Sequence, residues 1–164
     1  MTEQQKLKLL KNLEADCTLS MAQLAAMAGV DVGEAEAAIR ACEAEHIVLG
    51  YKAIVDWDRT QEESVTALIE VKLVPQRGAG FDRIAERIYQ YEEVESVYLM
   101  FGAYDLAVTI SGRSLKEVAT FVSRHLSTLD GVTATATHFI LKKYKEKHLI
   151  FEKRQEQGKE WIFT

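Results

Sequence analysis

The hydrophobic pattern of this 164-residue chain changes its period once, across a wholly polar stretch at residues 58–64. Before that stretch apolar residues recur at helical spacing, and after it they mostly alternate as in strands. Because one regular element cannot satisfy both periods, we expect two domains joined by a linker. The predicted boundaries are 1–57 for the first domain, 58–64 for the linker and 65–164 for the second domain.

The first domain is predicted to hold three helices followed by a small β-hairpin or ribbon. Ser20 and Gln23 have the spacing of a capping box at the start of the second helix. Asp31 caps a third helix that runs to about His46, and the short turn before it completes a helix-turn-helix. The apolar repeat of the first helix consists of Leu7, Leu10 and Leu13. Two apolar runs around a glycine, at residues 47–58, predict the ribbon.

The second domain has the order strand, helix, strand, strand, helix, strand, which predicts a ferredoxin-like βαββαβ fold. The expected class is therefore α+β, with an N-terminal winged helix-turn-helix followed by a ferredoxin-like domain of the dimeric α/β sandwich type. The strands are predicted at residues 65–74, 94–100, 104–111 and 132–144, and the helices at 81–91 and 115–129.

The charge of the chain argues against a nonspecific polyanion binder. The formal net charge is -5, whereas affinity for nucleic acid comes largely from clustered lysine and arginine against phosphates. The first 60 residues hold six Lys or Arg against ten Asp or Glu, a net charge of -4. The basic face that usually marks a DNA-binding module is missing from this count.

The third predicted helix separates into a core face and a solvent face on a helical wheel. Ala35, Ile39 and Cys42 share the core face. The opposite face is expected to carry Ala37, Arg40, Ala41 and Ala44. In a DNA groove an alanine can contact a thymine methyl, and an arginine can reach a guanine edge. The flanking residues would repel phosphates, and they are Glu34, Glu36, Glu43 and Glu45. The other interpretation is a vestigial or protein-binding module.

The stretch FGAYDLAVTI, at residues 101–110, holds a candidate ligand-binding turn. Gly102 lets the backbone turn between two strands and approach a ligand closely. Tyr104 offers a ring and a hydroxyl. Asp105 offers a carboxylate, either for an α-ammonium group or for capping backbone amides within the turn. Both interpretations of the carboxylate remain open at this point.

Three threonines alternate along the last predicted strand, at Thr133, Thr135 and Thr137. A row of hydroxyls on one strand face can hold a carboxylate or an amide. Threonine is also favoured in strands by its β-branched side chain, so a solvated strand face explains the row equally well.

Residue types that carry catalysis or bind metals do not gather at recognisable spacings. Cys17 and Cys42 form no CxxC pair and are expected to be reduced thiols. His125 and His138 have no partner at metal-ligand spacing, so we expect neither a metal nor a cofactor. The N-terminus shows no apolar signal core, and no stretch reaches the roughly 18 apolar residues of a membrane span. We therefore expect a cytoplasmic protein without a membrane partner.

In this order and at this length, the motifs resemble the leucine-responsive regulatory protein / asparagine regulator (Lrp/AsnC) family of transcription factors. The resemblance covers nearly the whole chain and rests on three stretches: the ribbon IVLGYKAIVD (47–56), the turn within FGAYDLAVTI (101–110), and the helix-to-strand passage LDGVTATATHFIL (129–141). The chain departs from the family pattern around the third helix, where Gly33, Ala38 and His46 replace the usual serine or threonine, arginine and glycine. These departures bear on the strength of DNA binding.

The resemblance implies a ligand-responsive DNA-binding regulator that forms homodimers and assembles them into tetramers or octamers. Its effector would be an amino acid or a related small molecule bound between C-terminal domains. The DNA-binding positions implied are Ser20, Gln23, Ala37, Arg40, Ala41 and Lys52. The ligand-binding positions implied are Met100, Gly102, Ala103, Tyr104, Asp105, Thr135 and Thr137.

Two other functions compete with a regulator. The first is a small-molecule-binding assembly protein whose acidic helix-turn-helix binds DNA weakly or not at all. The second is an enzyme, because ferredoxin-like dimers can be catalytic and the architecture resembles that of sirohaem decarboxylases. Against an enzyme stands the lack of a Cys/His nucleophilic pair, a metal triad or a phosphate-binding glycine loop in the sequence.

Overall fold

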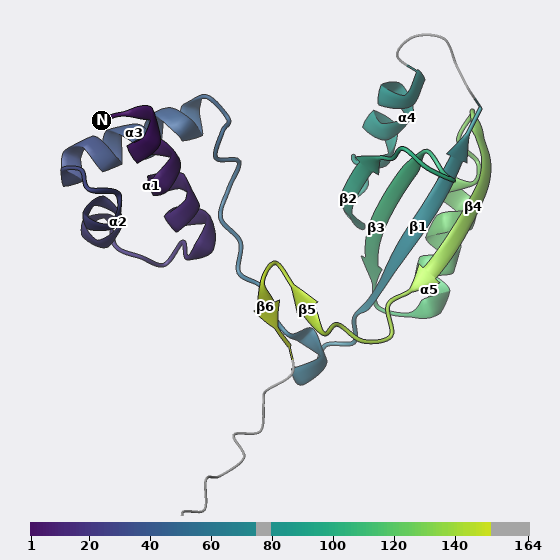
Figure 1. Ribbon diagram of the computed structural model, residues 1–164. Coiled ribbons are helices and arrows are strands. Elements are labelled where there is room, and N and C mark those ends of the chain that lie inside the picture. Colours follow the sequence, from purple (N-terminus) through teal and green to yellow (C-terminus); the bar gives the residue numbers. More distant parts are fainter. Residues whose placement is uncertain (75–79, 152–164) are drawn as a thin grey trace, which may run out of the picture. The chain divides into compact units, whose positions relative to one another are not determined.

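The structure, a computed structural model, describes residues 1–74 and 80–151 (Figure 1). The chain folds as two compact units, one covering Met1–Val55 and the other beginning at Asp56. Each unit has its own hydrophobic core. The two units are described separately below.

The N-terminal unit contains three helices, α1 (Glu3–Ala15), α2 (Met21–Ala28) and α3 (Val32–Ala44). Each helix has a complete capping box at its N-terminus. In it the residue just before the helix and the residue three positions later accept hydrogen bonds from each other's backbone amides. The pairs are Thr2 with Gln5, Ser20 with Gln23, and Asp31 with Glu34. Gly29 ends α2 in the left-handed conformation with φ of 70°, which suits glycine. The helix-turn-helix is therefore encoded by interactions between near neighbours in the sequence.

The core of the N-terminal unit consists of leucines, alanines and one isoleucine. Its fully buried members are Leu9, Leu13, Leu24, Ala25, Ala28, Ala35 and Ile39. The core face predicted for α3 is confirmed, since Ala35, Ile39 and Cys42 are each at most 5% exposed. The leucine repeat predicted for α1 is wrong in part: Leu7 is 52% exposed, and Leu9 is buried instead. Leu9 and Leu13 are four residues apart and so share one helix face.

The ribbon predicted at residues 47–58 is not formed within the chain. Residues 47–56 contain no strand, and Trp57–Arg59 forms a short 3-10 helix, η1. An isolated two-stranded hairpin is marginal in water unless its apolar face is covered. Here the apolar side chains have no such cover, since Leu49 is 86% exposed and Tyr51 is 49% exposed.

The C-terminal unit is a four-stranded antiparallel sheet with two helices packed on one face (Figure 1). The strands are β1 (Val65–Leu73), β2 (Val94–Leu99), β3 (Leu106–Gly112) and β4 (Val132–Phe139). The sheet order is β2-β3-β1-β4, so the first and third strands are central. The helices are α4 (Gly80–Ile88) and α5 (Leu115–Phe121), and α5 continues into η2 (Val122–Leu126), a π-helical turn. This is the ferredoxin-like βαββαβ arrangement that the sequence predicted.

One face of the sheet and the inner faces of the helices form the core of the C-terminal unit. Ile69 and Val71 of β1 and Val108 of β3 are completely buried there, against Ile88 of α4 and Leu126 of η2. Neither α4 nor α5 packs on the other face of the sheet. That open face carries alternate residues of the same strands, as the period of a strand requires.

Two predicted element ends are wrong. The last strand was expected to reach residue 144, but β4 ends at Phe139, which pairs with Ala67 near the start of β1. The Ile140 amide makes one more hydrogen bond, to the Thr66 carbonyl at 2.9 Å, and the chain then leaves the sheet near the start of β1. Residues Lys145–Glu146 (β5) and Leu149–Ile150 (β6) then form a separate two-stranded ribbon. The last helix was expected as one regular element, but its second half is the π-helical turn η2.

Candidate functional sites

The exposed face of α3 carries the residues expected to meet DNA. Ala37, Arg40 and Ala41 are all exposed, on the side of the helix opposite the buried Ala35 and Ile39. The Arg40 side chain is 79% exposed, and its guanidinium lies 3.6 Å from the Glu36 carboxylate one helical turn earlier. Exposed pairs of this kind contribute about 0.3–0.5 kcal/mol. Glu36 is therefore a weak competitor for the one guanidinium on this face.

Two of the glutamates that flank this face have partners of their own. The Glu34 carboxylate accepts a hydrogen bond from the Met1 ammonium at 3.1 Å. That hydrogen bond, with a weaker one from the Asp31 amide, lowers the pKa of Glu34. On the other flank the Tyr51 hydroxyl donates to Glu43 at 2.8 Å, which raises the pKa of Tyr51. The Met1 ammonium offsets the charge of Glu34 locally, whereas the neutral Tyr51 hydroxyl leaves the charge of Glu43 in place.

The other residues expected to contact DNA lie on α2 and on the segment after α3. Ser20 and Gln23 are exposed, but the Gln23 side-chain oxygen accepts hydrogen bonds from both the Ser20 amide and its hydroxyl, each at 2.9 Å. Their hydrogen bonds therefore serve the cap of α2. Lys52 is exposed and lies on the extended segment that follows α3.

The candidate ligand turn connects β2 and β3 and is held against β1 by Asp105. Its carboxylate accepts a hydrogen bond from the backbone amide of Leu73 at 2.7 Å, and its own amide donates to the Val71 carbonyl at 3.0 Å. The Met100 amide closes the turn by donating to the Asp105 carbonyl at 2.8 Å. The backbone amide that Asp105 caps is therefore that of Leu73 in β1, 32 positions earlier in the sequence. It is not an amide of the turn itself. A carboxylate has about four acceptor positions, so this contact leaves others free.

The glycine in this turn does not have the conformational role that the sequence suggested. Gly102 does not adopt the left-handed φ of Gly29 or Gly131. A side chain at Gly102 would meet no atom within 4 Å. Gly102 therefore leaves open space beside the turn. Around it Met100 and Ala103 are exposed and Tyr104 is half-buried.

The three threonines of β4 do not form one row. Leu73 pairs with Val132 while Lys72 pairs with Ala134, so Thr133 is the extra residue of a β-bulge. Its hydroxyl donates to the Lys72 carbonyl at 3.1 Å. The row of three was therefore a wrong prediction, because a bulge interrupts the alternation.

Thr135 and Thr137 do share a face, and it is the face that the helices cover. They pair with Val71 and Ile69, both completely buried in the core. The Thr135 hydroxyl lies 3.2 Å from that of Ser127, at the end of η2. The start of β4, the end of β1 and the ligand turn lie at one end of the sheet, because β1 is antiparallel to both β3 and β4. Thr137 lies farther along β4.

The structure thus gathers the turn, Leu73 and the start of β4, but it shows no contact between the turn and the two threonines. Sequence reasoning missed Leu73 and Ser127 as partners of Asp105 and Thr135. No signal in the sequence could have found either partner, since both are ordinary residues brought close only by the sheet.

The two histidines are involved in contacts within the C-terminal unit. His125 lies beside the rings of Tyr91 and Phe121, with centroids 4.9 and 5.2 Å away. The His138 imidazole lies 3.6 Å from the Glu70 carboxylate on the open face of the sheet. Within residues 1–74 and 80–151, no three His, Cys, Asp or Glu side chains are placed to hold a metal ion. In the same part of the chain no helix is long and apolar enough to cross a membrane.

A capped helix-turn-helix followed by a ferredoxin-like unit defines a class of helix-turn-helix transcriptional regulators with a ligand-binding domain. Residues 66–150 match the Lrp/AsnC ligand binding domain, which is more than half of the chain. The chain is 49% identical to the HTH-type transcriptional regulator YugG of Bacillus subtilis over 146 residues, 88% of each protein. It belongs to the Lrp/AsnC family.

Solved structures of regulators share the fold at lower sequence identity. The leucine response regulatory protein LrpA of Mycobacterium tuberculosis superposes with a TM-score of 0.73 at 21% identity, covering 91% of this chain and 98% of that one. The transcriptional regulator NMB0573 of Neisseria meningitidis, solved in complex with L-Met, has a TM-score of 0.69 at 19% identity. That superposition covers 89% of this chain and 94% of the neisserial one.

Proposed function

We propose that this regulator binds DNA weakly through the exposed face of α3 and responds to an amino acid or a closely related effector. The observation that carries the DNA-binding part is the strip of Ala37, Arg40 and Ala41, which is exposed and packs against nothing in its unit. An arginine between small apolar residues can read a guanine edge beside thymine methyl groups. The net charge of -4 over the first 60 residues makes this binding weak and sensitive to salt.

The effector site is proposed at the turn between β2 and β3. It would comprise Met100, Gly102, Ala103, Tyr104 and Asp105, with Thr135 and Thr137 on β4. The open space beside Gly102 and the free acceptor positions of Asp105 support a ligand with an ammonium group. The neisserial regulator in complex with L-Met supports an amino acid as the effector class.

We also propose that the chain self-associates. The open sheet face carries apolar and ring side chains, among them Leu68, Tyr98 and His138, and Tyr98 is 57% exposed. A face of this kind is normally covered by another layer. We propose a homodimer that assembles further into tetramers or octamers, because several weak modules can then hold one DNA segment together.

A second function is favoured by the pairing of Arg40 with Glu36 and by the acidic flanks of α3. In it the chain is a small-molecule-binding assembly protein, and its helix-turn-helix no longer contacts DNA. Measuring DNA affinity is enough to distinguish the two functions.

The test is selection of genomic DNA fragments by the purified protein at low salt, with and without a mixture of amino acids. We expect enrichment of related sites that changes when amino acids are added. Arg40→Ala should remove most of the enrichment, whereas Arg59→Ala, which removes the same charge outside the N-terminal unit, should keep it. Absence of enrichment in both conditions would overturn the regulator in favour of the assembly protein. Unchanged site preference in Arg40→Ala would remove Arg40 as a base contact.

A further inference from the structure

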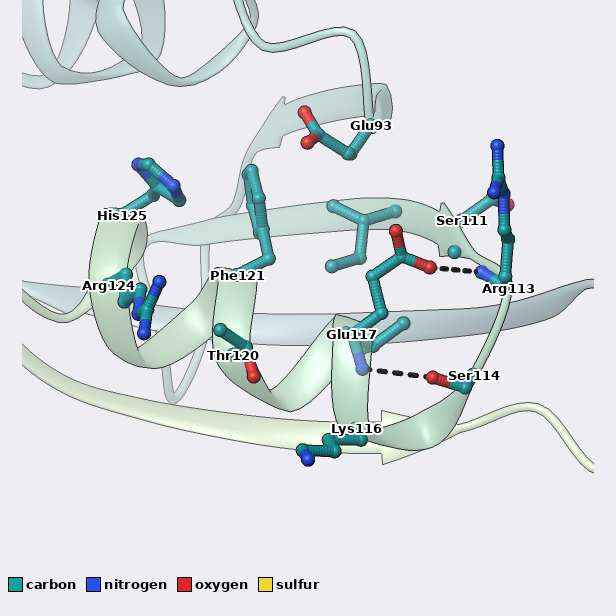
Figure 2. Close-up of a pocket in the computed structure, with 13 residues that line it drawn as sticks. Glu93, Ser111, Arg113, Ser114, Lys116, Glu117, Thr120, Phe121, Arg124 and His125 are labelled. Atoms are coloured by element: carbon teal, nitrogen blue, oxygen red, sulfur yellow. Dashed lines mark hydrogen bonds between the residues drawn. The ribbon is translucent and has the colours of Figure 1, made fainter.

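A pocket of about 530 Å³ lies in the C-terminal unit, at the end of the sheet opposite the ligand turn (Figure 2). The turn precedes β3, whereas the pocket is built on the last residues of β3, which pair with the start of β1. Its other walls are one side of α5 and η2 and the residue before β2, Glu93. A volume in this range is typical of sites for small ligands.

The floor of the pocket is apolar and aromatic. Ile110, Val118 and Phe121 line it, and each is at most 6% exposed as a residue. The Phe121 ring meets Tyr91 edge-on with centroids 5.3 Å apart, and the His125 ring continues this cluster. Rings packed in this way leave an aromatic edge on which a further ring or branched side chain can lie.

Two departures from regular geometry and one close backbone approach border this pocket. The pairing of β2 with β3 shifts between Val94 and Ser96, directly after Glu93. The helix that forms one wall changes from α to π at Val122. Gly112 passes so close to α5 that a side chain there would come within 3.1 Å of the Val118 methyl. Bulges and π-turns cost regular hydrogen bonds and occur preferentially beside functional sites.

Charges of both signs lie around the floor. Figure 2 shows Glu93, Glu117 and Arg113 on the same side of α5 as the Phe121 ring. The Glu117 carboxylate accepts a hydrogen bond from the Arg113 amide at 2.6 Å, which fixes its position and leaves other acceptor sites open. Among the described residues, the Arg113 guanidinium and the Glu93 carboxylate take part in no ion pair. Lys116 of α5 and Arg124 of η2 also line the pocket.

We propose that this pocket is a second ligand site, for a zwitterionic α-amino acid with an aromatic side chain. Glu93 and Glu117 receive the ammonium group, Arg113 receives the carboxylate, and the ring lies on Phe121. The pairing of opposite charges on the rim with an aromatic floor selects a ligand that has both charges and a ring. This site is separate from the turn of the proposed effector site, and neither depends on the other.

The test is titration of the full-length protein with L-phenylalanine, followed by calorimetry and by amide chemical shifts. Binding should shift the amides of Gly112, Arg113 and Glu117. Two truncated probes serve as controls: phenethylamine lacks the carboxylate, and 3-phenylpropanoate lacks the ammonium group. Each should bind at least about tenfold more weakly, a loss of about 1.4 kcal/mol.

Variants separate this site from the effector turn. Arg113→Gln and Glu93→Gln should each weaken binding at the pocket by about tenfold or more. Arg87→Gln is the control, because it removes the same charge from the C-terminal unit at an exposed residue of α4 that does not line the pocket, and it should change affinity less than twofold. Asp105→Asn should leave the shifts of Gly112 and its neighbours in place.

Three results would overturn the proposal. The first is no shift of the pocket amides at millimolar L-phenylalanine. The second is equal binding of either truncated probe, and the third is an equal loss of affinity in Arg87→Gln. Shifts confined to residues 100–105 would support the effector turn alone and also overturn the second site.

Discussion

The two units reach a stable core by different routes. In the N-terminal unit each helix is capped by residues three positions apart, and the core consists of leucines and alanines. In the C-terminal unit the core consists of branched and aromatic side chains brought together by a sheet whose central strands, β1 and β3, lie more than thirty residues apart in sequence. Charge differs too: the first 60 residues have a net charge of -4, and the rest of the chain has -1.

This difference indicates where each unit is sensitive. In a unit held by contacts between near neighbours in sequence, removing one helix cap should lower the free energy of unfolding by only about 1 kcal/mol. A unit held by contacts across a sheet depends on a few completely buried side chains, whose truncation leaves a cavity. The four changes below test that distinction, from the largest expected effect to the smallest.

Ile69→Ala should have the largest effect. Ile69 is completely buried at the centre of β1, so the substitution should lower the free energy of unfolding of the C-terminal unit by about 2–5 kcal/mol. Hydrogen exchange of the amides of each unit measures the two stabilities separately. Protection in α1 to α3 should stay unchanged, and Lys72→Ala, on the same strand but exposed, should have little effect. An equal loss of protection in both units would show that they do not unfold independently.

Asp105→Ala should lower the stability of the C-terminal unit by about 1–3 kcal/mol, because it leaves the buried Leu73 amide without its acceptor. If the carboxylate also binds the effector, the variant should lose its response to amino acids. Denaturant unfolding measures the first effect and calorimetric titration the second. Asp105→Asn is the matched control, since its side-chain oxygen can still accept from Leu73 while the charge is lost. A normal titration with Asp105→Ala would restrict Asp105 to holding the turn.

Ser20→Ala should lower the stability of the N-terminal unit by about 1 kcal/mol, through loss of the α2 cap. Thermal unfolding followed by helical circular dichroism measures this effect. Ser20→Asp keeps a capping acceptor and should restore the stability, but it adds a negative charge to a module that already has an excess. If Ser20 also approaches phosphates, the aspartate variant should be stable and bind DNA less tightly than the native protein. Loss of several kcal/mol in Ser20→Ala would contradict the local character of this unit.

Glu36→Gln should change stability by less than about 0.5 kcal/mol, because its pair with Arg40 is exposed. Its expected effect is on DNA: removing one acidic charge and freeing Arg40 should raise DNA affinity, most clearly at low salt. Fluorescence anisotropy with an enriched fragment measures this change. Glu14→Gln, the same charge change on α1, is the control for net charge alone. An equal gain in both variants would assign the effect to overall charge rather than to Arg40.

The local pattern of the sequence was enough to place the two folds and most of their elements. The capping box at Ser20 and the helix cap at Asp31 are confirmed, because both partners of a cap lie within three positions of each other. Four strands and two helices in the right order followed from hydrophobic period alone, since burial on one face imposes that period. The core face of α3 and its exposed strip followed from the same geometry.

Tertiary structure decided what depends on residues far apart in sequence. Leu9 rather than Leu7 is buried because packing against α2 selects the face of α1. Asp105 caps Leu73, and Thr133 leaves the row of threonines, because the register between β1 and its neighbours is set by the whole sheet. The segment after α3 forms no hairpin; only Val48 packs against the core of its unit, and Leu49 and Tyr51 stay exposed. The pocket beside Phe121 forms where a β-bulge, a π-helical turn and a close backbone approach come together, and no period or spacing along the chain encodes their meeting.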